Sequence, residues 1–216
     1  MIIEHEKYFR PGMGTENVAP FLRTLIQMVR PQRILEIGAG YTTPFILEGL
    51  EANKELLREN YSEYDERNLD PAYTNWHKEN NDPKLVIIDD ISLGEFKNKF
   101  NINSKYVEFI EGKFQGRSQE LLNKYGEFNM IWFDCGGPPE YHEFLNEYWE
   151  ICSQYMIFHF TFTQGRPNPN SNIISDTIAR WQKILGHSNV QRIDILEPHK
   201  YRQGSITVLK KVRELH

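Results

Sequence analysis

Cysteine is scarce in this chain, because Cys135 and Cys152 are the only two among 216 residues. Two cysteines make no disulfide framework, and their scarcity is typical of a reducing compartment. Long hydrophobic runs are lacking too, since no apolar stretch approaches the roughly 20 residues that a membrane-spanning helix needs. The opening residues, Met-Ile-Ile-Glu-His-Glu, lack the basic head and apolar stretch of a secretory signal. We therefore expect a cytoplasmic location and no membrane partner.

An excess of positive charge is also absent. The chain has 25 Lys and Arg against 30 Asp and Glu, for a net charge of −5. A polyanion would meet no attractive field, so we do not expect nucleic acid as a partner. The 39% hydrophobic and 13% aromatic content argues against disorder, and the length suits one well-cored domain. We expect a single domain over residues 1–216 and leave a homodimer open.

Short β-rich runs alternate with helical patterns along most of the sequence. The first five runs are continuously apolar, which is typical of strands covered on both faces. Alternation of this kind predicts a mainly parallel sheet between layers of helices. The last two runs have only residues 197–204 between them, which predicts an antiparallel hairpin at one side of the sheet. The seven runs are Arg33–Ile37, Lys84–Asp89, Lys105–Ile110, Phe128–Phe133, Gln154–Phe160, Val190–Leu196 and Ser205–Lys210. The helices are expected near 15–30, 43–59, 92–99, 118–125, 139–152 and 172–186.

Residues 51–83 interrupt this alternation with an acid-rich segment that contains three tyrosines and Trp76. A connection of this length is usually a functional lid or a disordered insert. The aromatic residues favour a lid, in which Trp76 would contact a substrate. A first helix that runs on, followed by a surface loop, is the alternative. At the other end, residues 1–30 are expected to form an N-terminal arm and helix.

The sequence Arg-Ile-Leu-Glu-Ile-Gly-Ala-Gly, residues 33–40, predicts a strand that ends in a tight loop. Glycine allows the backbone of such a loop to approach a ligand closely. A carboxylate at Glu36 suits a cationic cofactor such as S-adenosylmethionine, which carries an ammonium and a sulfonium. A nicotinamide dinucleotide is the alternative, but its Gly-x-Gly-x-x-Gly pattern has Thr43 in place of the third glycine. Glu36 would also repel a pyrophosphate.

Three further strand ends carry polar or glycine residues. Asp89 and Asp90 end the second run, where an acidic residue accepts hydrogen bonds from ribose hydroxyls in this topology. Glu111-Gly112-Lys113-Phe114 follows the third run, and Asp134-Cys135-Gly136-Gly137 follows the fourth. All of these ends should meet at the carboxyl edge of the sheet, where open parallel sheets bind ligands.

Together these motifs resemble the class I S-adenosylmethionine-dependent methyltransferases, and most closely the small-molecule O-methyltransferases, over residues 15 to 212. The pattern Leu-Glu-Ile-Gly at residues 35–38 and an aspartate after the fourth strand, Asp134, carry the likeness. The resemblance implies a Rossmann-like three-layer α/β sandwich with a mostly parallel seven-stranded sheet and a C-terminal antiparallel hairpin. S-adenosyl-L-methionine would be the cofactor and S-adenosyl-L-homocysteine the product.

The same resemblance assigns residues to parts of the cofactor. Asp89, or alternatively Asp90, would bind the ribose, and Lys113 and Phe114 would flank the adenine. Asp134 would lie beside the methionine portion or the transferred methyl. Thr42 stands where the family often has a third glycine, and it also suits the N-cap of the next helix. The amino acid end would be lined by Glu36, Gly38 and Gly40, and Ala39 and Thr42 are further cofactor-binding candidates.

His159 is the leading candidate for a general base. It lies near the carboxyl end of the fifth run, and an ordinary histidine pKa near 6.5 suits proton transfer at neutral pH. A core histidine bonded to the backbone is the alternative. Tyr141 is a second catalytic candidate beside Asp134. The substrate-binding candidates are Arg10, His142, Arg166 and Trp76.

The fifth run has no Asp or Glu at its end, where cation-dependent catechol-type enzymes bring a second metal ligand. Asp134 alone makes a poor magnesium site, so we expect no metal. The expected function is metal-independent methylation of a small molecule or peptide-like metabolite on an oxygen, either hydroxyl or carboxylate, as in metabolite or natural-product modification. A nicotinamide-dependent oxidoreductase and a non-catalytic cofactor-binding domain are the alternatives.

Overall fold

The structure of the chain is a computed structural model that describes residues 5–12, 14–60, 83–100, 102, 104–185, 190–197, 200 and 204–212. The segment 61–82, which holds most of the predicted lid and Trp76, lies outside the described residues. Helices and strands follow one another in the predicted alternation. In chain order they are η1 His5–Tyr8, α1 Val18–Val29, β1 Arg33–Ile37, α2 Thr42–Asn60, β2 Lys84–Asp89, α4 Leu93–Phe100, β3 Val107–Glu111, α5 Ser118–Tyr125, β4 Phe128–Phe133, α6 Pro138–Tyr148, β5 Cys152–His159, β6 Phe162–Thr163, β7 Arg166–Pro167, α7 Pro169–Leu185, β8 Val190–Leu196 and β9 Ser205–Lys211.

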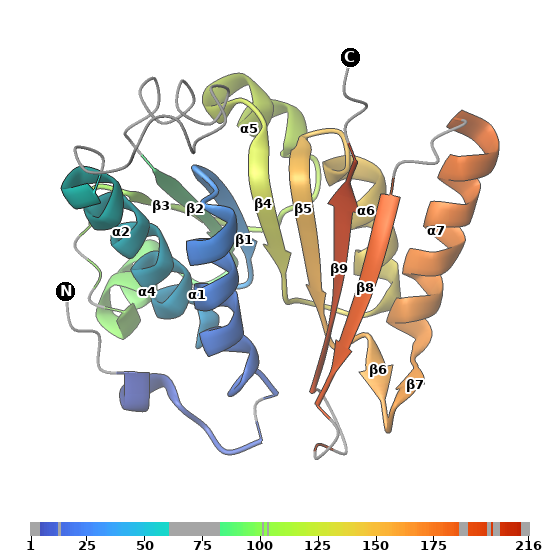
Figure 1. Cartoon of the computed structure of the whole chain (residues 1–216), viewed down its shortest axis with the longest axis horizontal. Coiled ribbons are helices and arrows are strands. Elements are labelled where there is room, and N and C mark those ends of the chain that lie inside the picture. The colour runs from blue at the N-terminus through green and yellow to red at the C-terminus, as the bar shows by residue number, and fades with distance from the viewer. Residues whose placement is uncertain are drawn as a thin grey trace.

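One seven-stranded sheet forms the centre of the molecule, with the strand order β3-β2-β1-β4-β5-β9-β8 (Figure 1). Neighbours among β1 to β5 pair in parallel, whereas β9 pairs antiparallel with both β5 and β8. The predicted mostly parallel sheet and its C-terminal antiparallel hairpin are therefore confirmed. The strand order reverses between β1 and β4, which makes a topological switch point there.

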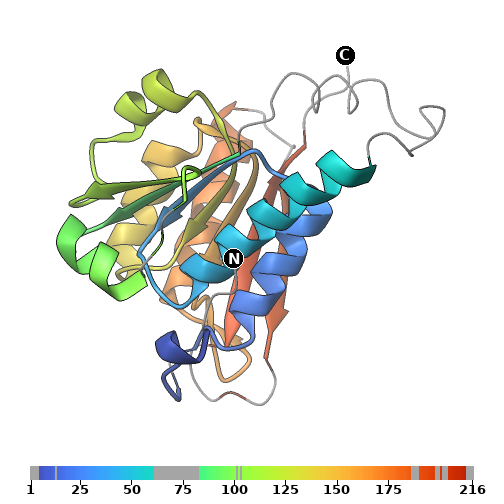
Figure 2. The same ribbon diagram turned by 90° about the vertical axis from the view of Figure 1, so that its left-hand side faces the viewer.

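Helices cover both faces of the sheet, with α1 and α2 on one face and α5, α6 and α7 on the other (Figure 2). Alternate side chains of the apolar strands explain these two layers. Ile34 and Trp132 pack in the core of the first face, and Leu35 and Phe133 pack in the core of the second. A strand buried on both faces reads as a continuous apolar run, because each face needs its own set of apolar side chains.

Several element bounds differ from the sequence-based expectation. The helix expected over 139–152 ends at Tyr148, and Cys152 begins β5 instead of lying on a helical face. The side chains of β3 are mostly half-buried, because β3 is an edge strand and has a neighbouring strand on one side only. The two-residue strands β6 and β7 form an additional antiparallel pair that the sequence did not predict.

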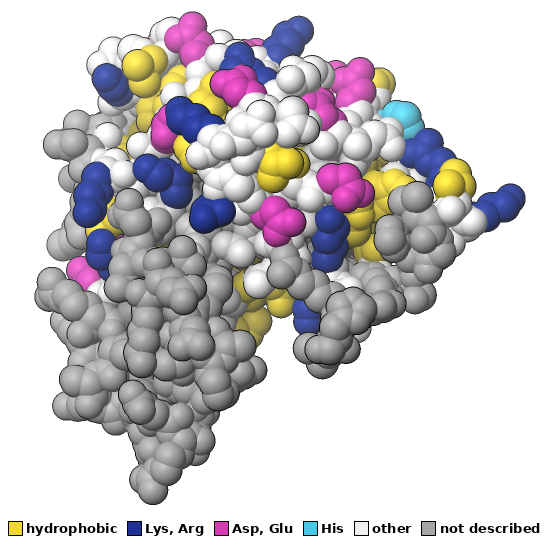
Figure 3. All heavy atoms as spheres, turned by 90° about the horizontal axis from the view of Figure 1, so that it is seen from above, with side chains coloured by type: hydrophobic (Ala, Val, Ile, Leu, Met, Phe, Trp, Pro, Cys, Tyr) yellow, Lys and Arg dark blue, Asp and Glu magenta, His cyan; other side chains and the backbone are white. Residues whose placement is uncertain are grey.

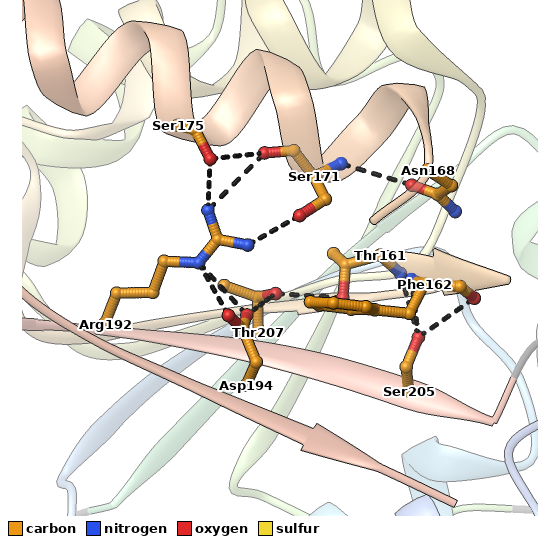
Figure 4. Close-up of polar contacts among 9 residues, drawn as sticks. All are labelled: Thr161, Phe162, Asn168, Ser171, Ser175, Arg192, Asp194, Ser205 and Thr207. Carbon is orange, nitrogen blue, oxygen red and sulfur yellow. Dashed lines mark hydrogen bonds and ion pairs between the residues drawn. The ribbon is translucent and has the colours of Figure 1, made fainter. Parts of the chain in front are cut away.

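A polar network attaches the C-terminal hairpin to α7 (Figure 4). The guanidinium of Arg192 on β8 donates to the hydroxyls of Ser171 and Ser175 on α7, at 2.6 Å each. It also donates to Asp194 at 3.0 Å, and Asp194 accepts from the hydroxyl of Thr207 on β9 at 2.6 Å. Hydrogen bonds thus supplement apolar packing where the sheet meets its last helix.

The carboxyl edge of the parallel strands faces the N-terminal segment and the β6–β7 pair. In Figure 1 the arrows of β4 and β5 point down toward both of them. Seen from the opposite edge, the described side chains carry charges of both signs, interspersed over the surface (Figure 3). Among the described residues, no helix is both long and apolar enough to span a bilayer.

Candidate ligand site at the carboxyl edge of the sheet

The ends of β1 and β4 approach each other closely at the switch point. The backbone N–H of Asp134 donates to the carbonyl of Ile37 at 3.0 Å, and that of Gly38 donates to the carbonyl of Ile88 at 2.9 Å. Gly38 has a φ of +95°, and a Cβ there would lie 2.6 Å from the carbonyl oxygen of Asp134. A side chain at this position would therefore be both strained and in collision, which explains the glycine.

Glu36 is fully buried beside this turn. Its Oε1 accepts a hydrogen bond from the hydroxyl of Thr42 at 2.8 Å, whereas its Oε2 has no hydrogen-bond partner among the described residues. Burial raises the pKa of Glu36 to about 8, with the hydroxyls of Thr42 and Thr43 opposing this and the charges of Asp134 and Asp89 adding to it. The hydroxyl of Thr42, the first residue of α2, therefore serves this carboxylate.

Asp89 organises the glycine loop from the end of β2. Its Oδ2 accepts from the backbone N–H of Ala39 at 2.6 Å, and its Oδ1 accepts from that of Ile91 at 2.9 Å. Asp90, the next residue, is exposed at the rim of the same site. Each oxygen of Asp89 retains a second lone pair, so both aspartates can still accept from a ligand.

A cavity of about 210 Å³ lies over the ends of β1, β2, β3 and β4. It brings together the predicted residues Gly38, Asp89, Asp90, Lys113 and Phe114. Burial raises the pKa of the Cys135 thiol to about 12, so that this lining cysteine stays protonated at neutral pH. The other lining residues are Ile37, Ile88, Gly112, Gln115 and Glu140.

A second cavity, of about 390 Å³, lies over the glycine loop and is lined on one side by the N-terminal arm, here the described residues 5–12 and 14–17. Of the predicted residues it includes Arg10, Gly40 and Asp134. The sequence did not indicate the others, because nothing in the patterns of the arm and α4, or in the single tyrosine after the glycine loop, marks them as site residues. They are Lys7, Tyr8, Thr15, Tyr41 and Lys99.

The arm is fixed in place from two directions. Tyr8 donates its hydroxyl to the carbonyl of Phe100 at 3.0 Å, and its ring stacks on that of Phe100 with centroids 5.3 Å apart. Glu16 forms an ion pair with Lys200, which lies in the connection between β8 and β9 and also pairs with Glu197 at 3.1 Å. The wall of the second cavity therefore depends on residues from both halves of the sequence.

Asp134 and His159 form a hydrogen-bonded pair next to the second cavity. Nδ1 of His159 lies 2.7 Å from Oδ1 of Asp134, and Nε2 lies 3.3 Å from the carbonyl oxygen of Gly14. The side chain of Asp134 is 30% exposed and lines the cavity, whereas that of His159 is 5% exposed and lines neither cavity. The structure thus differs from the expected geometry, in which His159 itself faces the acceptor.

The turn after His159 is strained and held by two amides. Phe160 has a left-handed φ of +53°, which is uncommon for a bulky residue. Its carbonyl accepts from Nδ2 of Asn168 at 2.8 Å and from Nδ2 of Asn170 at 3.0 Å. Strain of this kind persists where the surroundings impose it, often near functional sites. The sequence analysis did not find these two asparagines, which fix the end of β5.

Several other predicted site residues line neither cavity: Glu36, Ala39, Thr42, Tyr141, His142 and Arg166. Tyr141 is buried in the core with its hydroxyl bonded to the backbone carbonyl of His159, and burial raises its pKa well above the ordinary value. It therefore does not face an acceptor. His142 is exposed on α6, where it contacts Asn146, and Arg166 is exposed on β7. Neither of them lines a cavity described here.

Within the described residues, no group of three or more His, Cys, Asp or Glu side chains is arranged to hold a metal ion. The absence of a metal from the whole protein stays a prediction.

No protein-family model and no curated protein sequence matches the chain. Solved structures do match in three dimensions. An O-methyltransferase from Bacillus cereus in complex with SAH is 16% identical at a TM-score of 0.61, and the match covers 94% of this chain and 84% of that one. The O-methyltransferase TomG from Streptomyces achromogenes, in complex with SAM, is 16% identical at a TM-score of 0.57, and the match covers 97% of this chain and 86% of that one. A putative rRNA methylase from Clostridium thermocellum is 12% identical at a TM-score of 0.52, and the match covers 89% of this chain and 94% of that one. The chain therefore has the Rossmann-like methyltransferase fold.

Proposed function

We propose that the chain is an S-adenosylmethionine-dependent methyltransferase that acts on an oxygen atom of a small molecule or peptide-like metabolite. The strongest support is the carboxylate of Glu36, which is fully buried with one oxygen lacking a partner among the described residues. A buried acceptor without a partner is costly, and a ligand ammonium would remove that cost. The amino acid end of S-adenosylmethionine carries such a group, whereas a dinucleotide pyrophosphate would be repelled.

The rest of the site is compatible with this cofactor. Asp89 and Asp90 at the end of β2 suit ribose hydroxyls, and Lys113 and Phe114 line the same cavity where an adenine would lie. The glycine at position 38 allows close approach, since a Cβ there would meet the backbone of Asp134. When bound, the cofactor would supply an electrophilic methyl group on a sulfonium.

The protein would position the acceptor and accept its proton. Asp134 is the titratable group of the pair that lines the second cavity, so we assign proton acceptance to its carboxylate. His159 would act as a positioning residue, because its ring holds Oδ1 of Asp134 and is itself held by Gly14. The arm would exclude water from the acceptor, and alignment of the reacting atoms supplies a large part of catalysis in such transfers.

Nucleic acid remains a less favoured acceptor. The net charge is −5, and one edge of the molecule has interspersed charges among its described side chains (Figure 3). A protein described as an rRNA methylase nevertheless shares this fold, so the absence of a nucleic-acid partner stays a prediction, as do the cytoplasmic location and the homodimer.

Isothermal titration calorimetry with S-adenosylhomocysteine and with NAD⁺ tests the proposal. We expect saturable binding of S-adenosylhomocysteine and none of NAD⁺. A matched titration with 5′-methylthioadenosine, which lacks the amino acid end, should show weaker binding. Uptake of NAD⁺ together with indifference to S-adenosylhomocysteine would refute the proposed function.

A further inference from the structure

Three cationic side chains surround the second cavity of an otherwise acidic protein. Lys7 and Arg10 come from the arm, and Lys99 comes from α4. Asp134 is the one acidic residue that lines this cavity in the described part of the chain. The whole chain has a net charge of −5, so a cluster of three cations at one cavity is not expected from its composition. A cavity lined by one sign of charge raises the local concentration of ligands of the opposite sign.

None of these three cations is neutralised by a carboxylate of the described residues. Lys99 donates to the carbonyl of Ala39 at 3.5 Å and lies 4.9 Å from the ring centroid of Phe100. Lys7 lies 5.9 Å from the ring centroid of Tyr8. No hydrogen bond or ion pair involves Arg10 within the described part of the chain.

Two acids near the cavity are already paired. Asp134 is bonded to His159, and Glu16 is paired with Lys200, which in turn pairs with Glu197. Among the described residues that line the cavity, three cations therefore face the single carboxylate of Asp134. An anionic ligand would complete the balance.

We propose that the second cavity binds an anionic group, a carboxylate or a phosphate, and that the methyl acceptor is an acidic molecule anchored by Lys7, Arg10 and Lys99. The inference rests on the proposed function and narrows its substrate class. Arginine and lysine are the usual partners of such groups, with arginine able to form two parallel hydrogen bonds. The anchored anion would place the rest of the acceptor beside the carboxylate of Asp134.

The carboxylate of the cofactor is a second source of the same chemistry. Its ammonium is assigned to Glu36, so the cofactor carboxylate would supply one negative charge and leave two of the three cations uncompensated. A separate anion on the acceptor accounts better for their number. The experiment below distinguishes the two sources.

Matched probes of similar shape test whether the cavity prefers a ligand with negative charge. We would measure the thermal stability of the protein, with and without saturating S-adenosylhomocysteine, in the presence of phenylacetate, phenyl phosphate or the neutral phenylacetamide. Both anions should raise the unfolding temperature in a saturable manner and the amide should not, because a ligand stabilises the state that it binds. Equal shifts with the amide, or no shift with either anion, would overturn the inference.

Two variants remove charge from the cavity: the double variant Lys7→Gln/Arg10→Gln and the single variant Lys99→Gln. Lys97→Gln is the control. Lys97 is exposed on the same helix as Lys99 and does not line the cavity, so its loss changes the charge as much as Lys99→Gln does without touching the site. All these side chains are exposed, so we expect the variants to fold normally. The affinity for phenyl phosphate should fall at least about fivefold in the two cavity variants and stay unchanged in the control.

Titrations of the variants with S-adenosylhomocysteine and 5′-methylthioadenosine identify the source of the anion. An acceptor site predicts unchanged affinity for both nucleosides. Loss of affinity for S-adenosylhomocysteine alone would instead assign the cations to the cofactor carboxylate and refute the acidic acceptor. Failure of wild-type protein to bind either nucleoside would count against the proposed function, while the probes without nucleoside would still decide whether the cavity prefers anions.

Discussion

The ring of His159 holds the carboxylate of Asp134 through a contact of 2.7 Å between Nδ1 and Oδ1, while its Nε2 faces the carbonyl oxygen of Gly14 at 3.3 Å. An ionised carboxylate and a carbonyl oxygen only accept hydrogen bonds. The ring satisfies both when both of its nitrogens carry hydrogen. Such a ring would donate one hydrogen bond to Asp134 and one to Gly14.

Nitrogen NMR of the imidazole rings checks this arrangement. At neutral pH we expect both ring nitrogens of His159 to be protonated. In Asp134→Asn the negative charge is gone, and one of the two nitrogens should lose its hydrogen. His142, exposed on α6, serves as the internal control whose signals should not change. A single protonated nitrogen of His159 in the wild-type protein would contradict the expectation.

Glu36 should couple cofactor binding to proton release. Its pKa is about 8 in the free protein, so most of it is protonated at pH 7. A ligand ammonium favours the ionised form, and binding of S-adenosylhomocysteine should therefore release up to roughly one proton. Calorimetry in two buffers of different ionisation enthalpy measures that release.

Glu36→Gln is the matched variant for this coupling. It should abolish the proton release and weaken S-adenosylhomocysteine about 10- to 100-fold, the effect of losing one hydrogen bond to a charged group. Binding of 5′-methylthioadenosine should change little, because that ligand has no ammonium. Unchanged affinity for S-adenosylhomocysteine would show that Glu36 does not bind the ligand.

The same residue should make the stability of the free protein depend on pH. The pKa of Glu36 rises from the ordinary 4.5 to about 8 on folding, so the folded state binds more protons than the unfolded state between these values. Its contribution to the free energy of unfolding should fall by up to about 1.4 kcal/mol per pH unit in this window and level off above it. Urea unfolding of the wild type and of Glu36→Gln, compared from pH 5 to pH 9, isolates this contribution. If the difference in free energy of unfolding between the two proteins did not change with pH, the assigned contribution of Glu36 would be refuted.

Gly38→Ala should destabilise the protein by at least about 1–3 kcal/mol, because a side chain there is strained and meets the carbonyl of Asp134 at 2.6 Å. Gly40 is the matched control, since a Cβ at Gly40 has no heavy atom within 4 Å. Gly40→Ala should change the free energy of unfolding by no more than about 0.5 kcal/mol. Denaturant unfolding of both variants gives the comparison, and equal losses would contradict the role assigned to the turn.

Arg192→Met should lower the free energy of unfolding by roughly 1–3 kcal/mol. The change keeps an apolar stem but removes the guanidinium that joins Asp194 to the hydroxyls of Ser171 and Ser175. Lys183→Met, an exposed change on the same helix α7, should stay within about 0.5 kcal/mol. Similar stability of the two variants would show that the network of Figure 4 does not hold the hairpin.

The sheet was predictable because its buried strands must be apolar on both faces. The bounds of β1, β2, β4 and β8 agree with the apolar runs in the sequence. Around Cys152 the prediction was wrong, since the apolar residues before it suit either the end of a helix or the start of a strand. The β6–β7 pair was missed because strands of two residues leave no periodic pattern.

Part of the site could be predicted for a topological reason. Residues that follow parallel strands must meet at one edge, so the sequence could predict that Gly38, Asp89, Lys113 and Asp134 gather there, where they line the two cavities. The orientation of the His159 side chain could not be predicted, because a periodic pattern does not tell which hydrogen-bond partners a buried polar ring has. Tyr141 likewise follows a strand end in sequence but turns into the core.

The ion pair between Glu16 and Lys200 has a consequence for synthesis of the protein. These two side chains are 184 positions apart in the sequence. A nascent chain can dock Tyr8 on Phe100 as soon as residue 100 has left the ribosome, but Glu16 has to wait for Lys200. The arm should therefore take its final position only after the connection between β8 and β9 has been synthesised.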